Sequence, residues 1–212
     1  MPLVYQQNIN EHTKLAVWHI DEEEHFFLQR VPLQKEITHP HKRLQHLAGR
    51  YLLTELFPDF PLELIRIADT KKPFLENEKF HFSLSHSGDY AAVLVSTANR
   101  VGVDIELVSE KAERIKNKFL SSREQLMMEE VKMKGLSISN HELFAFAWSI
   151  KEAMFKWYGL GGIDFRKHLH IDQLKISTNE LEANCSFLKN GNIPLKIHGL
   201  SFKNNVLTWT VS

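Results

Sequence analysis

The sequence has little cysteine, no net charge and no long apolar run, and each shortage excludes a class of protein. Cys185 is the single cysteine in 212 residues, so no internal disulfide can form, and such a lone thiol is typical of a small core residue. Lys plus Arg and Asp plus Glu each total 26, which excludes a strongly basic nucleic-acid-binding protein and an acidic disordered one. A charged ligand must therefore be bound by a local group of residues.

The start of the chain and its apolar runs predict no membrane partner. Residues 1–15 contain no basic segment followed by an apolar one, as a signal peptide would, and no run approaches the ~20 apolar residues of a membrane span. Together with the unpaired cysteine, these features predict a cytoplasmic protein.

Several common site motifs are also missing. There is no Walker A loop and no G-x-S-x-G elbow, and the glycines at 159–162 do not form a dinucleotide fingerprint. The pairs His39/His41 and His168/His170 lack a third ligand at zinc spacing, so we interpret them as structural or surface residues.

The hydrophobic pattern predicts an α+β chain in two halves, 1–100 and 101–212. The first half is predicted to contain a strand at 15–20, a short helix or turn at 21–30, a helix at 36–57 that begins near Pro40, and strands at 62–69, 80–87 and 90–97. The second half is predicted to begin with a strand at 101–108. Two helices follow: one from Ser121 or Ser122 to Met133, with Glu124 in a capping box, and one from His141 to Tyr158, ended by Gly159. The rest is predicted to form strands at 168–176, 182–189, 193–202 and 206–212, with turns at Asn190-Gly191 and Asn204-Asn205. We therefore expect each half to be a long helix packed on a small, mainly antiparallel sheet, and the absence of a low-complexity linker predicts that the halves pack tightly.

The strand "VGVDIELV" places two carboxylates on one face. Strict alternation puts its aliphatic residues on one side and Asp104 and Glu106 on the other. A solvated acidic face is one interpretation. The other is a Mg²⁺ site, since Mg²⁺ takes one or two carboxylates and leaves its other positions to water and phosphate.

The helix "WSIKEAMFKWYG" carries charged residues beside a buried stripe. Glu152 and Lys156 lie off that stripe, at a spacing that also suits an ordinary surface salt bridge. Alternatively, Glu152 joins the two strand carboxylates around a metal ion and Lys156 neutralises a phosphate. Lys151 either shares that phosphate role or pairs with a carboxylate.

Two further segments offer contacts for an anion. Arg43 and Arg50 lie seven residues apart on the first long helix, with Lys42 adjacent and His46 between them, which is typical of a solvated basic face or of a phosphate site. In "FSLSHSGDYAAV", the segment Ser85–Ser87 stands at a strand end, where hydroxyls and an imidazole could line a pyrophosphate.

Taken together, the order and spacing of these motifs resemble one family. From Lys42 to Gly162 the segments "KRLQHLAGR", "KKPFL", "FSLSHSGDYAAVLVS", "VGVDIELV" and "FAWSIKEAMFKWYGLGG" are similar to those of 4′-phosphopantetheinyl transferases of the larger, monomeric class that includes the surfactin-synthetase activator. The resemblance implies two pseudo-symmetric halves with coenzyme A in the cleft between them. It also implies a set of site residues: Asp104, Glu106 and Glu152 for Mg²⁺ (or Mn²⁺), His86 and Lys156 for the pyrophosphate, Arg43 and Arg50 for the 3′-phosphate, and Lys72 and Pro73 for the adenine nucleotide.

The implied reaction is transfer of phosphopantetheine from coenzyme A to a serine of an apo acyl or peptidyl carrier protein. Glu152, Lys156 and His86 are the expected catalytic residues, and residues 115–133, with Phe119 as a probe, are the expected carrier surface. Two alternatives are a non-catalytic coenzyme A-binding module and a Mg²⁺-dependent pyrophosphate hydrolase. The sequence departs from the family in having Lys71, where glycine is usual, before Lys72-Pro73.

Overall fold

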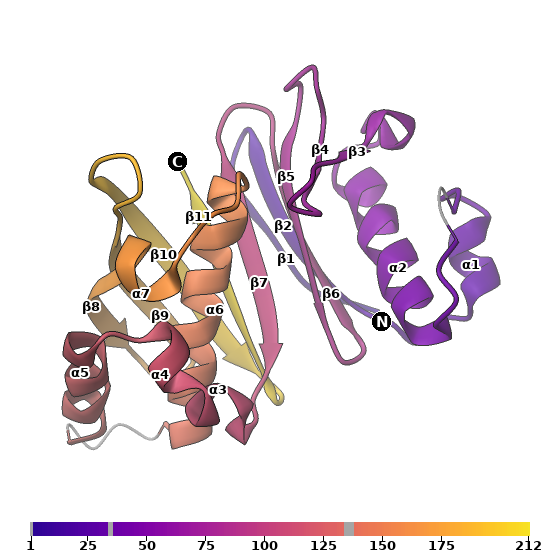
Figure 1. Ribbon diagram of the computed structural model, residues 1–212. Coiled ribbons are helices and arrows are strands. Elements are labelled where there is room, and N and C mark those ends of the chain that lie inside the picture. Colours follow the sequence, from indigo (N-terminus) through magenta and orange to yellow (C-terminus); the bar gives the residue numbers. More distant parts are fainter. Residues whose placement is uncertain (1, 34–35, 134–137) are drawn as a thin grey trace.

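The computed structural model describes residues 2–33, 36–133 and 138–212, and it contains two antiparallel sheets with helices packed on each (Figure 1). The first sheet has the order β1-β2-β6-β5 and consists of β1 (Leu3–Asn10), β2 (Thr13–His19), β5 (His81–Ser87) and β6 (Tyr90–Ser96). Its helices are α1 (Glu24–Leu28), α2 (Pro40–Leu56) and the short 3₁₀ helix η1 (Leu62–Leu64), and the two-residue strands β3 (Arg66–Ile67) and β4 (Pro73–Phe74) form a separate hairpin.

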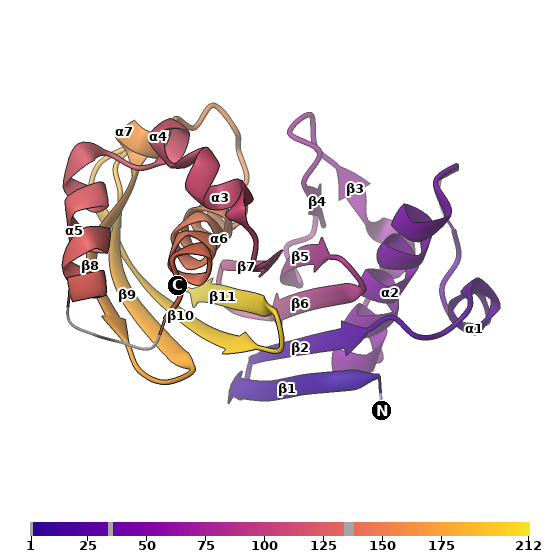
Figure 2. The same ribbon diagram turned by 90° about the horizontal axis from the view of Figure 1, so that it is seen from below.

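The second sheet wraps around one long helix. It has the order β7-β11-β10-β9-β8 and consists of β7 (Val101–Leu107), β8 (Leu169–Ile176), β9 (Glu180–Phe187), β10 (Ile193–Phe202) and β11 (Asn205–Val211). Figure 2 shows α6 (Asn140–Tyr158) inside the curve of this sheet, with the smaller helices along the open side of the curve and beside the edge strand β8. These are α3 (Glu110–Arg114), α4 (Lys116–Phe119), α5 (Ser122–Met133) and α7 (Phe165–His168).

The α+β class and the long helices are confirmed. Pro40 is the first residue of α2, Gly159 ends α6 with φ 77°, and the capping box at α5 is present, with Ser121 N donating to Glu124 Oε2 at 2.7 Å. The described residues contain no helix long and apolar enough to cross a bilayer. Internal pseudo-symmetry stays a prediction.

Some predicted elements are wrong. Strand β1 was not predicted, because it lies at the edge of its sheet with most of its residues exposed, and its sequence is therefore mostly polar. The strand predicted at 62–69 is instead η1 and the two residues of β3, and α3 and α4 were missed because each is at most five residues long. The last turn consists of Lys203 and Asn204, since Phe202 pairs with Asn205.

A row of serines joins the two sheets. The backbone N–H groups of Val103, Ile105 and Leu107 on β7 donate to the hydroxyls of Ser83, Ser85 and Ser87 on β5, at 3.0, 3.1 and 3.0 Å. Behind them, aliphatic residues of β2, β6, β7 and β11 form a core shared by both sheets. This contact aligns β7 with β5, the two strands that carry predicted site residues.

Gly102 allows α6 to lie directly on β7. A Cβ atom at Gly102 would lie 2.0 Å from the carbonyl oxygen of Ala153 and 2.8 Å from the backbone nitrogen of Trp157. The helix therefore approaches the strand at backbone distance, beside the residues that the sequence singles out.

Candidate active site

Asp104 lies at the centre of the contact between α6, β7 and β5. The carboxylate is only 4% exposed; its Oδ1 accepts from Lys156 Nζ at 2.6 Å and from Ser85 Oγ at 2.9 Å. Its Oδ2 is buried and has no hydrogen-bond partner among the described residues. The interpretation of this strand face as a solvated acidic surface is therefore wrong, because α6 covers it.

Glu152 and Glu106 face the same centre. Burial, and then the negative charges of Asp104 and Glu106, raise the pKa of Glu152 to about 7. The pKa of Glu106 is also raised, by burial and by Asp104. Lys156 forms its ion pair with Asp104. The interpretation of Glu152 and Lys156 as an ordinary surface salt bridge is therefore wrong. The three carboxylates repel one another, which is the electrostatic condition that a cation would relieve.

The carboxylates fit a divalent cation without forming a finished cage. Among residues 2–33, 36–133 and 138–212, no three His, Cys, Asp or Glu side chains gather closely enough to hold a metal ion. Mg²⁺, however, needs only one or two protein carboxylates when phosphate and water supply the rest. The unpartnered Oδ2 of Asp104 and the repulsion from Glu106 and Glu152 are therefore compatible with such an ion.

Lys151 points away from this centre, into the core. It is 0% exposed, pairs with Glu124 at 2.8 Å, and donates to the carbonyl oxygens of Phe119 at 2.7 Å and Phe165 at 3.0 Å. Of the two predictions for Lys151, pairing with a carboxylate is confirmed and a phosphate contact is wrong.

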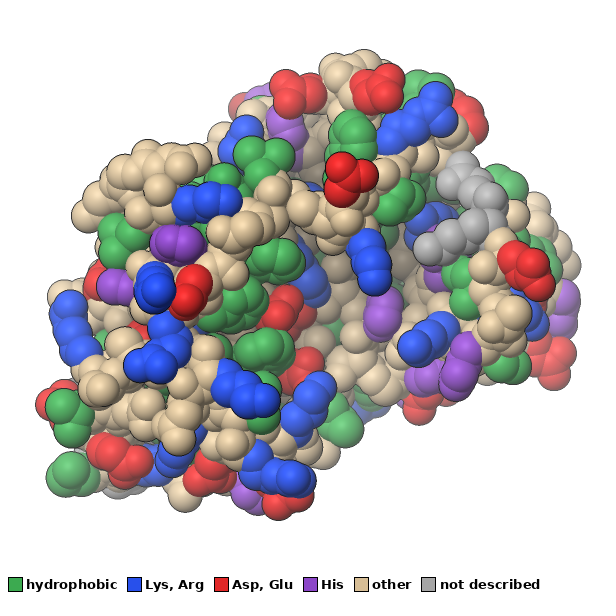
Figure 3. All heavy atoms as spheres, in the orientation of Figure 1, with side chains coloured by type: hydrophobic (Ala, Val, Ile, Leu, Met, Phe, Trp, Pro, Cys, Tyr) green, Lys and Arg blue, Asp and Glu red, His purple; other side chains and the backbone are tan. Residues whose placement is uncertain are grey.

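A basic cavity opens beside the carboxylates, between α2 and the β3–β4 hairpin. It has a volume of about 430 Å³, and none of the described residues that line it is acidic. Its charged and titratable lining residues are Lys42, His46, Arg50, Lys71 and His86. Figure 3 shows that this face of the molecule is hollowed between the two halves, with Lys, Arg, Asp, Glu and His side chains gathered along the hollow.

Arg50 is the most deeply placed cation of this cavity. It is 6% exposed, its guanidinium contacts His46 Nδ1 at 3.1 Å, and burial lowers its pKa to about 10. Its Nε has no hydrogen-bond partner in the described part of the chain. Buried charges are normally paired, so the cavity has the character of an anion site.

The predicted arginine pair is divided. Arg43 does not line the cavity, and its guanidinium instead binds Glu24 at 2.7 Å and donates to the carbonyl oxygen of Ile37 at 3.0 Å. Its assignment to a phosphate stays a prediction. Lys42 and His46, which complete the row with Arg50, were noted in the sequence but not assigned; their i, i+4, i+8 spacing is the signal that would have identified them.

Ser85 and His86 border both the cavity and the carboxylates. The Ser85 hydroxyl accepts from Lys156 Nζ at 2.8 Å while it donates to Asp104. His86 is exposed to solvent at its surface. Partial burial of its imidazole, followed by the positive charge of Lys156, lowers its pKa. Both predicted residues are therefore placed next to Lys156.

The loop before Lys72-Pro73 is fastened to the end of α6. Lys72 Nζ donates to the carbonyl oxygen of Lys156, and Thr70 Oγ1 to that of Gly159 at 3.1 Å. Burial, with a smaller effect from Arg100, lowers the pKa of Lys72 to about 8. Pro73 lines a second cavity of about 200 Å³, together with Phe155 and Lys156. The Lys72 ammonium thus joins the β3–β4 loop of the first half to α6 of the second.

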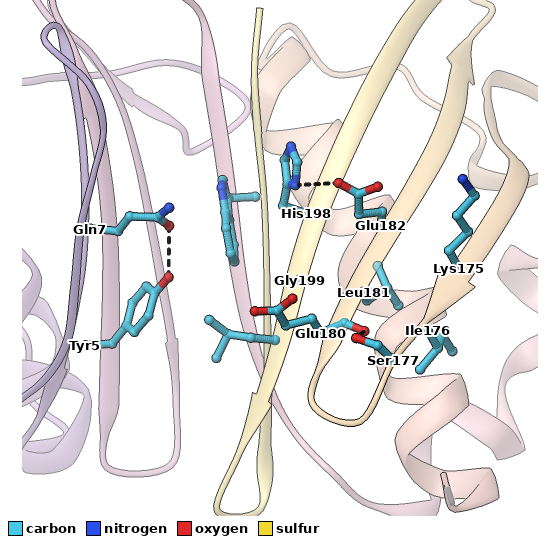
Figure 4. A pocket seen from close by; sticks show the side chains of 12 residues that line it. Tyr5, Gln7, Lys175, Ile176, Ser177, Glu180, Leu181, Glu182, His198 and Gly199 are labelled. Atoms are coloured by element: carbon cyan, nitrogen blue, oxygen red, sulfur yellow. Dashed lines mark hydrogen bonds and ion pairs between the residues drawn. The ribbon is translucent and has the colours of Figure 1, made fainter. Parts of the chain in front are cut away.

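Another groove, of about 420 Å³, contains none of the predicted site residues. Figure 4 shows Tyr5 and Gln7 of β1 on one side and His198 and Glu182 of the second sheet on the other. Glu182 already pairs with Lys196 at 2.8 Å. We therefore place the candidate site in the basic cavity and at the neighbouring carboxylates.

The expected carrier-surface probe, Phe119, is buried. It is 1% exposed and packs edge-on against Trp148, with ring centroids 5.1 Å apart. A change at Phe119 would disturb the core, so it cannot serve as a surface probe. Leu126 and Met133 of α5, by contrast, are 67% and 81% exposed.

Comparison with known proteins identifies the family. The model of the 4′-phosphopantetheinyl transferase superfamily matches residues 100–208, just over half of the 212-residue chain, and this range includes the site residues of β7 and α6. The chain belongs to the 4′-phosphopantetheinyl transferase superfamily. The matched range ends within β11.

Individual transferases of the superfamily align with part of the chain. It is 33% identical over 119 residues to the 4′-phosphopantetheinyl transferase AcpT of Escherichia coli K12, covering 56% of this chain and 59% of that protein. It is 32% identical over 117 residues to the 4′-phosphopantetheinyl transferase gsp of Aneurinibacillus migulanus, covering 54% and 46%. It is 29% identical over 145 residues to a putative 4′-phosphopantetheinyl transferase of Haemophilus influenzae, covering 65% and 59%. The chain thus spans less than two thirds of the length of these relatives.

Proposed function

We propose that this protein transfers the 4′-phosphopantetheine group of coenzyme A to a serine of an apo acyl or peptidyl carrier protein and releases 3′,5′-adenosine bisphosphate. The observation that carries the proposal is the juxtaposition of Asp104, Glu152 and Lys156 with a cavity whose described lining residues include no acid. Such a site suits a reaction in which a polyphosphate is held, and charge at its phosphates is stabilised, next to a base. Its expected setting is a monomer in the cytoplasm.

The basic cavity would bind the nucleotide end of coenzyme A. Arg50, with Lys42 and His46 beside it, supplies cations for the 3′-phosphate, and the smaller cavity at Pro73 is proposed for the adenine nucleotide. Arg43 would join them only after leaving Glu24. This leaves the pyrophosphate at Ser85, His86 and Lys156, next to the carboxylates.

Asp104, Glu106 and Glu152 are the residues proposed to hold Mg²⁺, or Mn²⁺ in its place. When bound, the ion would neutralise negative charge on the pyrophosphate oxygens. Lys156 would then exchange its contact with Asp104 for one with phosphate, and His86 would donate to the same group. The buried carboxylate oxygen Oδ2 of Asp104, which has no hydrogen-bond partner in the described part of the chain, supports this assignment.

The transfer breaks one phosphorus–oxygen bond and forms another. The carrier's serine oxygen attacks the phosphorus that bears the pantetheine arm, and the oxygen bridging the two phosphates departs with the adenosine bisphosphate. Glu152, directly or through a water, takes the serine proton as the general base. Lys156 and His86 stabilise the charge on the departing oxygen.

The first experiment is intact-mass spectrometry of an apo acyl carrier protein incubated with this protein, coenzyme A and Mg²⁺, with a parallel sample in EDTA. We expect the carrier to gain the mass of one phosphopantetheine, and EDTA to prevent the gain. A set of carriers from fatty-acid, polyketide and peptide synthesis that all stay unmodified would refute the proposal, as would release of free phosphopantetheine without a carrier.

A further inference from the structure

Lys71 occupies a backbone position that favours glycine. Lys71 N donates to the carbonyl oxygen of Ala68 at 2.8 Å, and Ala68 N to that of Lys72 at 2.9 Å, which is the pattern of a three-residue hairpin loop. The last residue of such a loop is left-handed, and Lys71 has φ 65°. A side chain is disfavoured in this conformation because its Cβ crowds the backbone.

Contacts within the protein do not offset that cost. The Lys71 side chain is exposed, and it makes no ion pair or side-chain hydrogen bond with any residue that the structure describes. Strained positions that gain nothing from packing are found chiefly where a side chain acts on a ligand. The Lys71 ammonium is therefore available to contact a ligand bound in the cavity.

The side chain lines the basic cavity from the side opposite α2. Lys42, His46 and Arg50 come from one row of that helix, whereas Lys71 comes from the β3–β4 loop. The loop is held in place by Lys72 and Thr70, which bind the end of α6. An anion in the cavity would thus be contacted by cations from two elements, and Lys71 would close the loop side.

We propose that Lys71 is a specificity-determining residue that binds the 3′-phosphate of coenzyme A and so distinguishes coenzyme A from 3′-dephospho-coenzyme A. The proposal rests on the proposed function, because that function places the 3′-phosphate in the basic cavity. Binding of this doubly charged phosphate would offset the conformational cost of a lysine in the left-handed region.

The test is calorimetric titration of the full chain, without a carrier, with coenzyme A and separately with 3′-dephospho-coenzyme A. In Lys71→Gly and Lys71→Ala, affinity for coenzyme A should fall about fivefold, which is the size expected for an exposed ion pair. Affinity for 3′-dephospho-coenzyme A should stay within about twofold of wild type, and Lys71→Arg should retain the preference.

Lys203→Gly is the matched control. Lys203 is also a left-handed lysine, with φ 52°, in the turn between β10 and β11, and it does not line the basic cavity. The same substitution there should raise or preserve the melting temperature, as at Lys71, and should leave both affinities unchanged. Relief of backbone strain is thereby separated from loss of a phosphate contact.

Three results would overturn the inference: equal loss of affinity for both ligands in the Lys71 variants, no loss for either, or a wild-type protein that does not prefer coenzyme A. The carrier assay separates this inference from the proposed function. If the wild type modifies a carrier but the Lys71 variants keep its ligand preference, only the role of Lys71 fails. If the preference depends on Lys71 but carriers stay unmodified, only the transfer fails.

Discussion

At the scale of the residue, Glu152 is costly to stability and central to the proposed chemistry. Its pKa rises from 4.5 to about 7, so between these values the folded state binds a proton that the unfolded state has released. Stability contributed by this group therefore falls as pH rises through this interval, and the whole cost is present above pH 7. Glutamine has the same shape and no charge.

Glu152→Gln is accordingly expected to raise the melting temperature in EDTA, and to raise it more at pH 8 than at pH 5. The same variant should lose carrier modification by at least about 100-fold, since it cannot accept the serine proton. Thermal unfolding at the two pH values and the mass-spectrometric assay measure the two effects.

Glu130→Gln, at an exposed position of α5, is the control and should change neither quantity. Adding Mg²⁺ should stabilise the wild type more than Glu152→Gln, because the variant has lost a proposed ligand. Equal stability of wild type and variant at pH 8 would contradict the repulsion inferred among the carboxylates.

The neighbouring Lys151 acts through the core. It is completely buried, and Glu124 also accepts from Ile171 N at 2.9 Å, so their ion pair connects α6, α5 and β8. Removal of one partner leaves a buried charge unpaired, which typically costs about 3–5 kcal/mol.

We expect Lys151→Met to lower the free energy of unfolding by about 3 kcal/mol or more, and the double variant Lys151→Met/Glu124→Gln to be more stable than the sum of its single changes predicts. Urea unfolding of the four proteins measures this coupling. The same cycle at the surface pair Lys132–Glu129, 3.0 Å apart, should give less than about 1 kcal/mol. A coupling no larger in the buried pair would contradict this account.

At the scale of the element, the position of α6 depends on Gly102. A methyl group there would meet the carbonyl of Ala153, a helix backbone atom that cannot rotate away. Gly102→Ala should therefore cost about 3 kcal/mol, the upper end for overpacking, and should weaken carrier modification by shifting Glu152 and Lys156 relative to Asp104.

Gly49→Ala on α2 supplies the contrast. The added Cβ would meet only Leu84 Cδ2, at 3.5 Å, and alanine favours a helix by up to about 1 kcal/mol over glycine. Urea unfolding should show opposite signs for the two alanine variants. A Gly102→Ala protein as stable as wild type would show that α6 can move away from β7 without cost.

The β3–β4 loop depends on Lys72 for its attachment to α6. Lys72→Met removes the bond to the Lys156 carbonyl, so we expect faster amide hydrogen exchange at the end of α6, whereas Lys79→Met at an exposed site should have no such effect.

The pKa of Lys72 is lowered to about 8. Above that pH the folded state has lost a proton that the unfolded state keeps, so the wild type should gain stability relative to the variant between about pH 8 and pH 10. A constant difference over this range would contradict the lowered pKa.

At the scale of the whole molecule, local patterns predicted the long elements and the centre of the site. Proline at the start of α2, glycine at the end of α6 and alternation along β7 each depend on neighbours in sequence. The motifs at 104–106 and 152–156 also carry the family's spacing, and the structure brings Asp104 and Lys156 within 2.6 Å. These features required no knowledge of the fold.

The remaining features depend on contacts distant in sequence. The helical spacing of Arg43 and Arg50 could not show that Glu24 binds one of them, nor could the motif show that Lys151 points at Glu124. The departure at Lys71 was visible in the sequence, but its left-handed backbone was not. Side-chain partners across elements are set by packing, which a pattern within one element does not specify.

The serine row between β5 and β7 also bears on aggregation. In the part of the chain that the structure describes, each of these strands pairs with a neighbouring strand on one side only, and an unpaired strand edge can recruit another chain. Hydroxyls of β5 in the first half satisfy N–H groups of β7 in the second, so the first half protects the edge of β7. If the gene were divided near residue 100, each fragment would expose such an edge together with half of the shared apolar core, and the fragments would self-associate unless they were produced together.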